Sequence, residues 1–333
     1  MNYIDPTKNQ HYLSQIEQRL NSIPGKSDKI YSFILKDRET YTVELENVKG
    51  KGIQSNLSFI DLYTFDFLDE GMRKNFESAF GKYESKIDAS TFALLSKIES
   101  NDNDILDELK DVLRLKILNF IRNPYNIVKV LNSIGVLADH YPVQGTLLEE
   151  YRRLEERDDG GTQHICKVFG VTREQYLKWM KVIFLVLIDI GGGETLLEHL
   201  ITELLESSGL STNAIIVGVT DVHSDKKAVL SDRSFVDYSG IAGGALAMSF
   251  NLNANYFISI GISDYDSEID KLIPEGPYRD KLKETILGTR KNINILVLKD
   301  CEEALSQLAN YNKNAVYQCH SKVFCSTSTI YMG

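Results

Sequence analysis

Three polar side chains near the start of the chain, His11, Gln15 and Arg19, recur every four residues. The sequence predicts a helix over Asn9–Asn21, and on a helix this spacing places the three side chains on one face. An imidazole that titrates near neutral pH, an amide and a guanidinium can together bind an anion such as a phosphate diester and transfer a proton. The alternative is a partly buried histidine hydrogen-bonded to its neighbours, with Arg19 at the surface.

A second polar pair, Ser231-Asp232, ends a predicted strand in the last third of the chain. Asp232 could supply a carboxylate or a metal ligand, because carboxylates serve in both roles. It would reach His11 only if strands from both ends of the chain complete one sheet. The other possibility is that these residues form a buried polar network joining the two ends.

Other motifs have a plainer interpretation. Glu77 and Glu84 are seven residues apart, so they face the same way on a helix but lie ~10 Å apart along its axis, too far to chelate one ion. They could each work with a different partner, or simply lie along the side of the helix without a function.

Gly191-Gly192-Gly193 matches neither a dinucleotide loop nor a Walker loop, which favours a helix-breaking turn. The four cysteines show no zinc-binding spacing and are expected to be reduced, and Cys319 and Cys325 are interpreted as core residues.

The elements that would position these residues indicate a single α+β domain spanning 1–333. Residues 1–70 are expected to hold the first helix and strands over Ile30–Leu35, Tyr41–Val48 and Ile60–Phe67. Residues 71–208 are mostly helical. Residues 213–333 return to strands, with a helix over Glu302–Gln318. Strands at both ends around a helical middle segment predict a sheet region completed by both termini.

Composition limits the partners of the chain. The net charge is −10 over 333 residues, which opposes a general affinity for phosphate backbones but leaves room for a local basic groove. The longest apolar run, Val182–Ile190, is too short for a membrane helix, which needs ~20 residues. No signal peptide is recognisable near Met1, so we expect a cytoplasmic protein without membrane association. The sequence identifies no cofactor and no metal site.

Three segments together resemble a known family. The segment over 9–15, Asn-Gln-His-Tyr-Leu-Ser-Gln, is similar to the N-terminal His-Tyr signature of the bacterial domain of unknown function family 4238. Leu230-Ser231-Asp232 resembles its later Ser-Asp signature, and the stretch over Leu308–Asn314, with Asn312 inside it, resembles its asparagine-rich closing helix. The match departs at Ser14 and Ser234, where the family usually has proline.

The resemblance implies a setting rather than a reaction, because the family has no established activity and its members resemble accessory proteins of bacterial anti-phage and mobile-element loci. The leading hypothesis is an intracellular defence effector that hydrolyses a phosphodiester in nucleic acid. His11 would be the acid or base, Arg19 the anion clamp and Asp232 a second carboxylate, with Gln15, Ser231 and Asn312 binding the substrate. The alternative is a non-catalytic binding or sensor module, and either protein could act with a co-encoded partner.

Overall fold

The structure is a computed structural model. It describes residues 3–68, 71–102, 104–157, 160–206, 210–220, 225–239, 246–264, 273, 275–289 and 293–333. The predicted subregion boundaries at residues 70 and 208 lie outside these ranges. The described part of the chain is a mixed α+β fold, as the sequence predicts.

One antiparallel sheet joins the two ends of the chain. Its order is β12 (Leu230–Ser231), β17 (Lys322–Cys325), β3 (Lys29–Asp37) and β4 (Thr42–Leu45), and β5 (Lys51–Gly52) also pairs with β3. In its register, Val323 lies opposite Phe33, and both side chains are buried. The prediction that N- and C-terminal strands form a common sheet is therefore confirmed.

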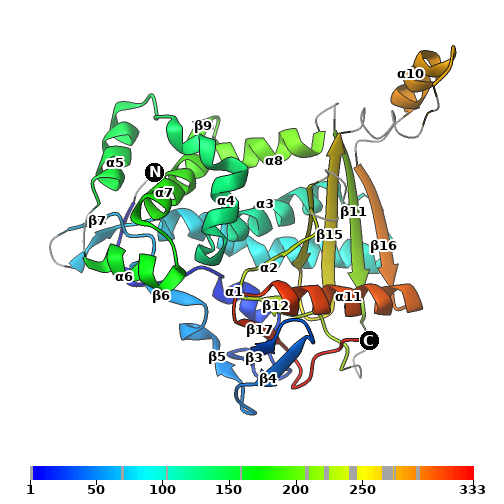
Figure 1. Cartoon of the computed structure of the whole chain (residues 1–333), viewed down its shortest axis with the longest axis horizontal. Helices are drawn as coiled ribbons and strands as arrows, with labels where there is room; N and C mark the ends of the chain where they lie inside the picture. The colour runs from blue at the N-terminus through cyan, green and yellow to red at the C-terminus, as the bar shows by residue number, and fades with distance from the viewer. Residues whose placement is uncertain are drawn as a thin grey trace.

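The C-terminal third also builds a second sheet of five strands. Its order is β13 (Val236–Asp237), β14 (Leu246–Asn251), β15 (Tyr256–Asp264), β11 (Leu210–Gly218) and β16 (Ile293–Lys299). In this sheet, β11 and β16 are the pair of neighbours that run parallel. The chain between them includes β12 to β15 and then α10 (Arg279–Thr289). The chain passes from β16 to β17 through α11 (Glu302–Gln318). In Figure 1, α11 runs across the lower ends of β15, β11 and β16. Helix α11 thus links the two sheets, and its Tyr311 ring stacks on Phe257 of β15.

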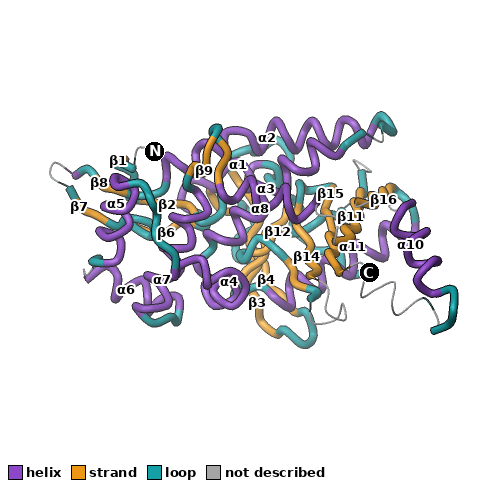
Figure 2. Tube along the Cα trace, turned by 90° about the horizontal axis from the view of Figure 1, so that it is seen from above, coloured by secondary structure: helices purple, strands orange, loops and turns teal. Residues whose placement is uncertain are grey.

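Helices fill the middle of the chain; some lie at the end of the molecule away from the five-stranded sheet, and others extend alongside that sheet (Figures 1 and 2). Their apolar stripes face one another, and on α2 (Glu77–Glu99) and the residue before it the stripe of Phe76, Phe80, Tyr83 and Ile87 is buried. No described helix is long and apolar enough to cross a bilayer. The helices are α2 (Glu77–Glu99), α3 (Leu106–Arg122), α4 (Ile127–Ile134), α5 (Gly145–Glu155), α6 (Gly160–Phe169), α7 (Arg173–Leu187) and α8 (Leu196–Glu206), with 3-10 turns at Ile53–Ser55, Pro124–Asn126 and Gly135–Asp139.

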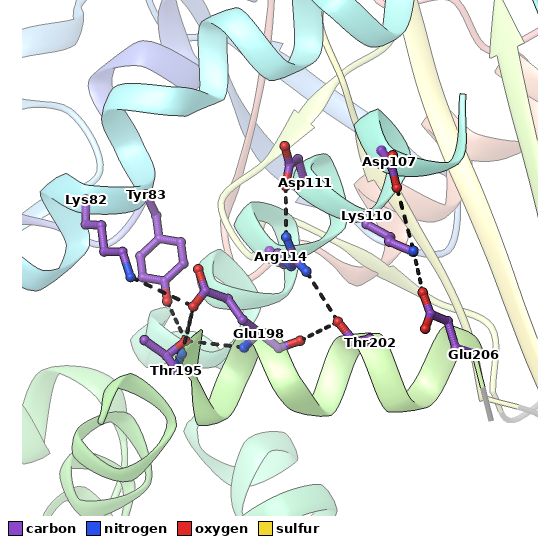
Figure 3. A network of polar contacts seen from close by, with 10 residues as sticks. All are labelled: Lys82, Tyr83, Asp107, Lys110, Asp111, Arg114, Thr195, Glu198, Thr202 and Glu206. Atoms are coloured by element: carbon purple, nitrogen blue, oxygen red, sulfur yellow. Dashed lines mark hydrogen bonds and ion pairs between the residues drawn. The ribbon is translucent and has the colours of Figure 1, made fainter. Parts of the chain in front are cut away.

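Polar contacts attach α8 to α2 and α3 (Figure 3). Thr195 and Glu198 exchange side chain-to-backbone hydrogen bonds at the start of α8, an arrangement that caps a helix N-terminus. The Thr195 hydroxyl also lies 2.7 Å from the Tyr83 hydroxyl on α2. Further along, Arg114 of α3 donates to Thr202. These contacts hold α2 and α3 in a fixed relation.

The first predicted helix, over Asn9–Asn21, is wrong in its first half. Residues Asn9–His11 form β2, which pairs with β6 (Ser58–Ile60), and α1 covers only Gln15–Arg19. The helix starts late because the Ser14 side chain accepts a hydrogen bond from the Glu17 backbone N–H and so caps it.

The single strand predicted over Ile60–Phe67 is also wrong, because a turn after Ile60 separates β6 from β7. The remaining short strands are β1 (Ile4–Asp5), β7 (Asp66–Phe67), β8 (Arg73–Lys74), β9 (Asp189–Gly191) and β10 (Glu194–Thr195).

Candidate functional site

His11 lies on β2, so it does not share a helical face with Gln15 and Arg19. Its Nε2 is 3.1 Å from the Gln54 carbonyl oxygen, and the side chain is half-buried. Arg19 is exposed, and its Nη2 donates to Gln15 Oε1 at 2.9 Å. Gln15 and Arg19 therefore bind one another at the surface, as i and i+4 side chains of a helix do.

The buried face of α1 is polar. Glu17, which is fully buried, forms an ion pair with Lys116 of α3 and accepts a hydrogen bond from Asn119. Asn21 donates to the Glu17 carbonyl and to Asn251 of β14. These contacts connect the N-terminal helix to both α3 and the second sheet. The residues that Glu17 and Asn21 bind there, Lys116, Asn119 and Asn251, lie about 100 residues or more further along the sequence.

Asp232 binds the backbone of the segment that precedes β17. Its carboxylate accepts hydrogen bonds from the backbone N–H groups of His320, Ser321 and Lys322 at 2.8–2.9 Å. Burial raises the pKa of Asp232, and the three N–H donors oppose that shift because they stabilise the ionised form. Ser231, also buried, accepts a hydrogen bond from the Arg233 N–H. Asp232 therefore anchors the start of β17, and Ser231 stabilises the turn that follows β12.

Asn312 has a similar role on α11. Its Oδ1 accepts from the Val229 N–H at 3.0 Å, and its Nδ2 donates to the carbonyls of Lys227 and Tyr331 at 2.9 Å. The side chain is fully buried. No hydrogen bond or ion pair that we find among the described residues joins His11 to Asp232 or Asn312, so the six predicted residues do not form one constellation.

The structure instead gathers charged residues around Arg122, the last residue of α3. The Arg122 side chain is 1% exposed, and its Nη1 lies 2.6 Å from Oε1 of Glu84 on α2. Its guanidinium also packs over the Phe80 ring, 4.8 Å from the ring centroid. The Nε and Nη2 atoms are buried and have no hydrogen-bond partner. These two atoms form the parallel pair of donors with which arginine binds a carboxylate or phosphate.

Glu77 approaches the same guanidinium from one end of α2. Burial raises the pKa of Glu77 to about 8, the Arg122 charge opposes the shift, and Glu84 adds to it. Its Oε1 is buried without a hydrogen-bond partner. At neutral pH, Glu77 is therefore mainly protonated, and Glu84 alone neutralises Arg122. The pKa of Arg122 itself is raised above its ordinary value because the neighbouring acidic groups outweigh its burial.

His11 stands at the edge of this cluster. Burial lowers the pKa of His11, and the positive charges of Arg122 and Arg19 act in the same direction, whereas the Gln54 hydrogen bond and the Glu84 carboxylate raise it. The net result is an imidazole that is neutral at pH 7 and able to accept a proton. Shifted pKa values gathered in one place are typical of functional sites. We therefore take Glu77, Glu84, Arg122 and His11 as the candidate site.

Sequence reasoning placed Glu77 and Glu84 on one face but did not include Arg122. A signal for it exists: Arg122 follows Leu115 and Leu118 at helical spacing, which puts a guanidinium on the apolar face of α3. A charge on such a face needs buried partners. Which partners it finds depends on how α2 packs on α3.

Comparisons with known protein families, with curated proteins and with solved structures find no match, so no relative assigns a role to these residues. Within the described ranges, no three His, Cys, Asp or Glu side chains come together as ligands of a metal ion.

Proposed function

We propose that the protein is a binding or sensor module for a small anion that carries a carboxylate or phosphate group. The observation that carries the proposal is the unpartnered Nε and Nη2 edge of Arg122, buried beside a carboxyl group that is protonated near neutral pH. An anion there would accept two hydrogen bonds from Arg122 and one from Glu77. Bonds of this charge-assisted kind are about twice as strong as neutral ones.

The surroundings of Arg122 favour a small ligand. Glu84, which forms the ion pair with Arg122, has a side chain that is 26% exposed, and His11 is half-buried. The Tyr63 hydroxyl donates to the Arg122 carbonyl at 2.7 Å and fixes the end of α3. Because the guanidinium is 1% exposed, any ligand requires its neighbours to move, and a small anion requires less movement than a polymer backbone.

A second candidate is hydrolysis of a phosphodiester, and the position of His11 is the observation that favours it. A neutral imidazole beside Arg122 could act as general base while the guanidinium stabilises negative charge. In this version the anion clamp is Arg122 in place of Arg19. The setting in cytoplasmic bacterial defence, with nucleic acid or a co-encoded protein as partner, is supported only by the resemblance to family 4238.

Titration calorimetry with inorganic phosphate and with acetate tests the first proposal. We expect saturable binding at pH 6.5 that weakens as the pH rises through about 8, because ionised Glu77 repels the anion. Arg122→Lys keeps the charge but loses the paired donors, so it should weaken binding about tenfold or more. The matched control is Arg19→Lys, which changes the exposed arginine and should leave affinity unchanged.

The outcomes separate the two candidates. If neither anion binds, or if Arg122→Lys binds as wild type does, the binding proposal is wrong. Turnover of bis(4-nitrophenyl) phosphate that falls by roughly 10²–10⁴-fold in His11→Gln, with unchanged melting temperature, would establish hydrolysis instead.

A further inference from the structure

A cavity of about 620 Å³ lies between the two-stranded sheet of β2 and β6 and the start of α6. Figure 1 shows α6, β6 and β7 together on the left of the molecule. Residues of these elements line the cavity, together with the turn that follows β6. Its volume is typical of small-molecule sites, which measure about 300–1,000 Å³.

One wall of the cavity is the outer face of the two-stranded sheet. Asn9 lies opposite Ile60 in its register, so the two side chains share a face and their Cβ atoms are typically about 5 Å apart. Gln10, which points to the opposite face, is fully buried. Ile60 is 64% exposed. Asn9 is exposed too, and its side chain makes no hydrogen bond that we find among the described residues. This wall therefore offers a free amide beside an apolar side chain.

Aromatic rings form the other walls. Phe67 of β7 is 48% exposed, and the Arg73 guanidinium lies 5.8 Å from its ring centroid. His164 of α6 is exposed, and its ring stacks on Phe59 with the centroids 5.6 Å apart. Ligand sites are lined mainly by apolar and aromatic side chains with a few polar groups among them. The walls of this cavity have that composition.

Strand β6 lies between two residues with an unusual backbone. Leu57 before it has φ +55°, and Asp61 after it has φ +54°. Residues other than glycine rarely adopt this left-handed conformation, and leucine does so less often than aspartate. Strained backbone of this kind gathers at ligand and active sites. It supports a binding role for the strand that lines the cavity.

The charge at the cavity is balanced. Among the described residues that line it, the one acidic side chain is Asp61, and none is Lys or Arg. Asp61 Oδ1 accepts a hydrogen bond from Arg73 Nε at 2.6 Å, so its charge already has a counter-ion. A phosphate group in the cavity would meet this carboxylate and find no lining cation, so a neutral ligand fits better.

We propose that this cavity binds a neutral purine, as the free base or as the nucleoside. The flat faces of a purine can pack on Phe67 and Ile60, because bases stack readily on aromatic side chains. The Asn9 amide carries a donor and an acceptor, which match the adenine edge formed by N6 and N7. The imidazole of His164 can add a further hydrogen bond. A nucleoside monophosphate binds less well, because its phosphate has no partner here.

Saturation-transfer NMR on the full chain, with adenosine as the probe, tests the proposal. We expect saturable binding from which adenine displaces adenosine more readily than AMP does. Phe67→Ala removes the stacking ring, and Asn9→Leu removes the amide but keeps a side chain of similar size. Each should weaken adenosine binding about fivefold or more. The matched controls are Phe92→Ala, at a ring of α2 that is 73% exposed, and Asn310→Leu, at an exposed position of α11; both should bind as wild type does.

Three results would overturn the inference: no adenosine binding, adenosine binding unchanged in Phe67→Ala or in Asn9→Leu, or AMP that displaces adenosine more readily than adenine does. Melting curves check that the variants fold, and because the two substitutions affect different walls, either one that folds decides the question. Arg122 does not line this cavity, so Arg122→Lys should bind adenosine as wild type does. Loss of adenosine binding in that variant would place the purine at the Arg122 cluster and also overturn the inference.

Discussion

Replacing Glu77 by glutamine tests the electrostatic basis of the candidate site. Glutamine has the shape of the protonated glutamic acid but cannot ionise. Because burial raises the pKa of Glu77 from 4.5 to about 8, the folded state holds a proton that the unfolded state has released over that interval. The stability contributed by this proton is fully present below pH 4.5, declines as the pH rises, and is lost once the pH exceeds about 8.

The size of the effect follows from the shift. Each unit of pKa difference is worth about 1.4 kcal/mol, so the free energy of unfolding of the wild type should fall by roughly 3–4 kcal/mol between pH 5 and pH 8 through this group alone. Glu77 lies in the first turn of α2, where the helix dipole favours a negative charge by about 0.3–1 kcal/mol. We therefore expect a contribution of about 2–4 kcal/mol, which Glu77→Gln abolishes.

Urea unfolding at intervals from pH 5 to pH 9 measures this difference. Glu77→Gln should match the wild type near pH 5 and exceed it in stability by about 2–4 kcal/mol at pH 8. The control is Asp88→Asn, an exposed position on the same helix, where we expect a change within about 0.5 kcal/mol. A variant whose stability relative to wild type is the same at both pH values, or which is destabilised at pH 8, would refute the reasoning. Glu77 would then be a second counter-ion of Arg122.

Other parts of the network give further expectations, all measured by urea unfolding. Asp232→Ala leaves three backbone N–H donors without their acceptor, so it should destabilise the protein by about 2–4 kcal/mol, whereas Ser231→Ala should cost about 1 kcal/mol. Lys116→Met leaves the Glu17 carboxylate buried without its cation and should cost about 3–5 kcal/mol. Adding Glu17→Leu to Lys116→Met should recover part of that loss, and strict additivity would show that the ion pair is not coupled. Asn312→Ala should cost about 1–3 kcal/mol, because the carbonyls of Lys227 and Tyr331 and the N–H of Val229 lose their partner.

Elements with a strong hydrophobic period were predictable from the sequence. Helix α11 spans the predicted Glu302–Gln318, and β3 and β4 lie where alternating residues placed them. Local patterns suffice there because one buried face decides the structure. The segment over Asn9–Asn21 fails for the opposite reason. Its helical spacing is real, but Asn9–His11 gain strand partners at Ser58–Ile60, which are distant in sequence.

In the candidate site, too, local spacing predicts some features, and others depend on residues that are distant in the sequence. The common orientation of Glu77 and Glu84 follows from their spacing on a helix. The pairing of Glu84 with Arg122 does not, because it depends on the packing of α2 against α3. The buried positions of Glu17 and Lys116 could not be predicted either, since each charged residue is acceptable inside only because the other is there.

The segment around Asp232 is hydrogen-bonded to the residues that follow α3, and this affects how a loss of function at Asp232 should be interpreted. Asn123, the residue after Arg122, donates to the Asp232 carbonyl at 2.8 Å, and Asn126 donates to the Arg233 carbonyl at 3.0 Å. The N-terminal segment fixes the same place through Tyr63. These hydrogen bonds therefore position the end of α3, and with it Arg122. A variant at Asp232 would loosen this support and weaken anion binding in parallel with its melting temperature, whereas a change at Arg122 would weaken binding beyond any effect on melting.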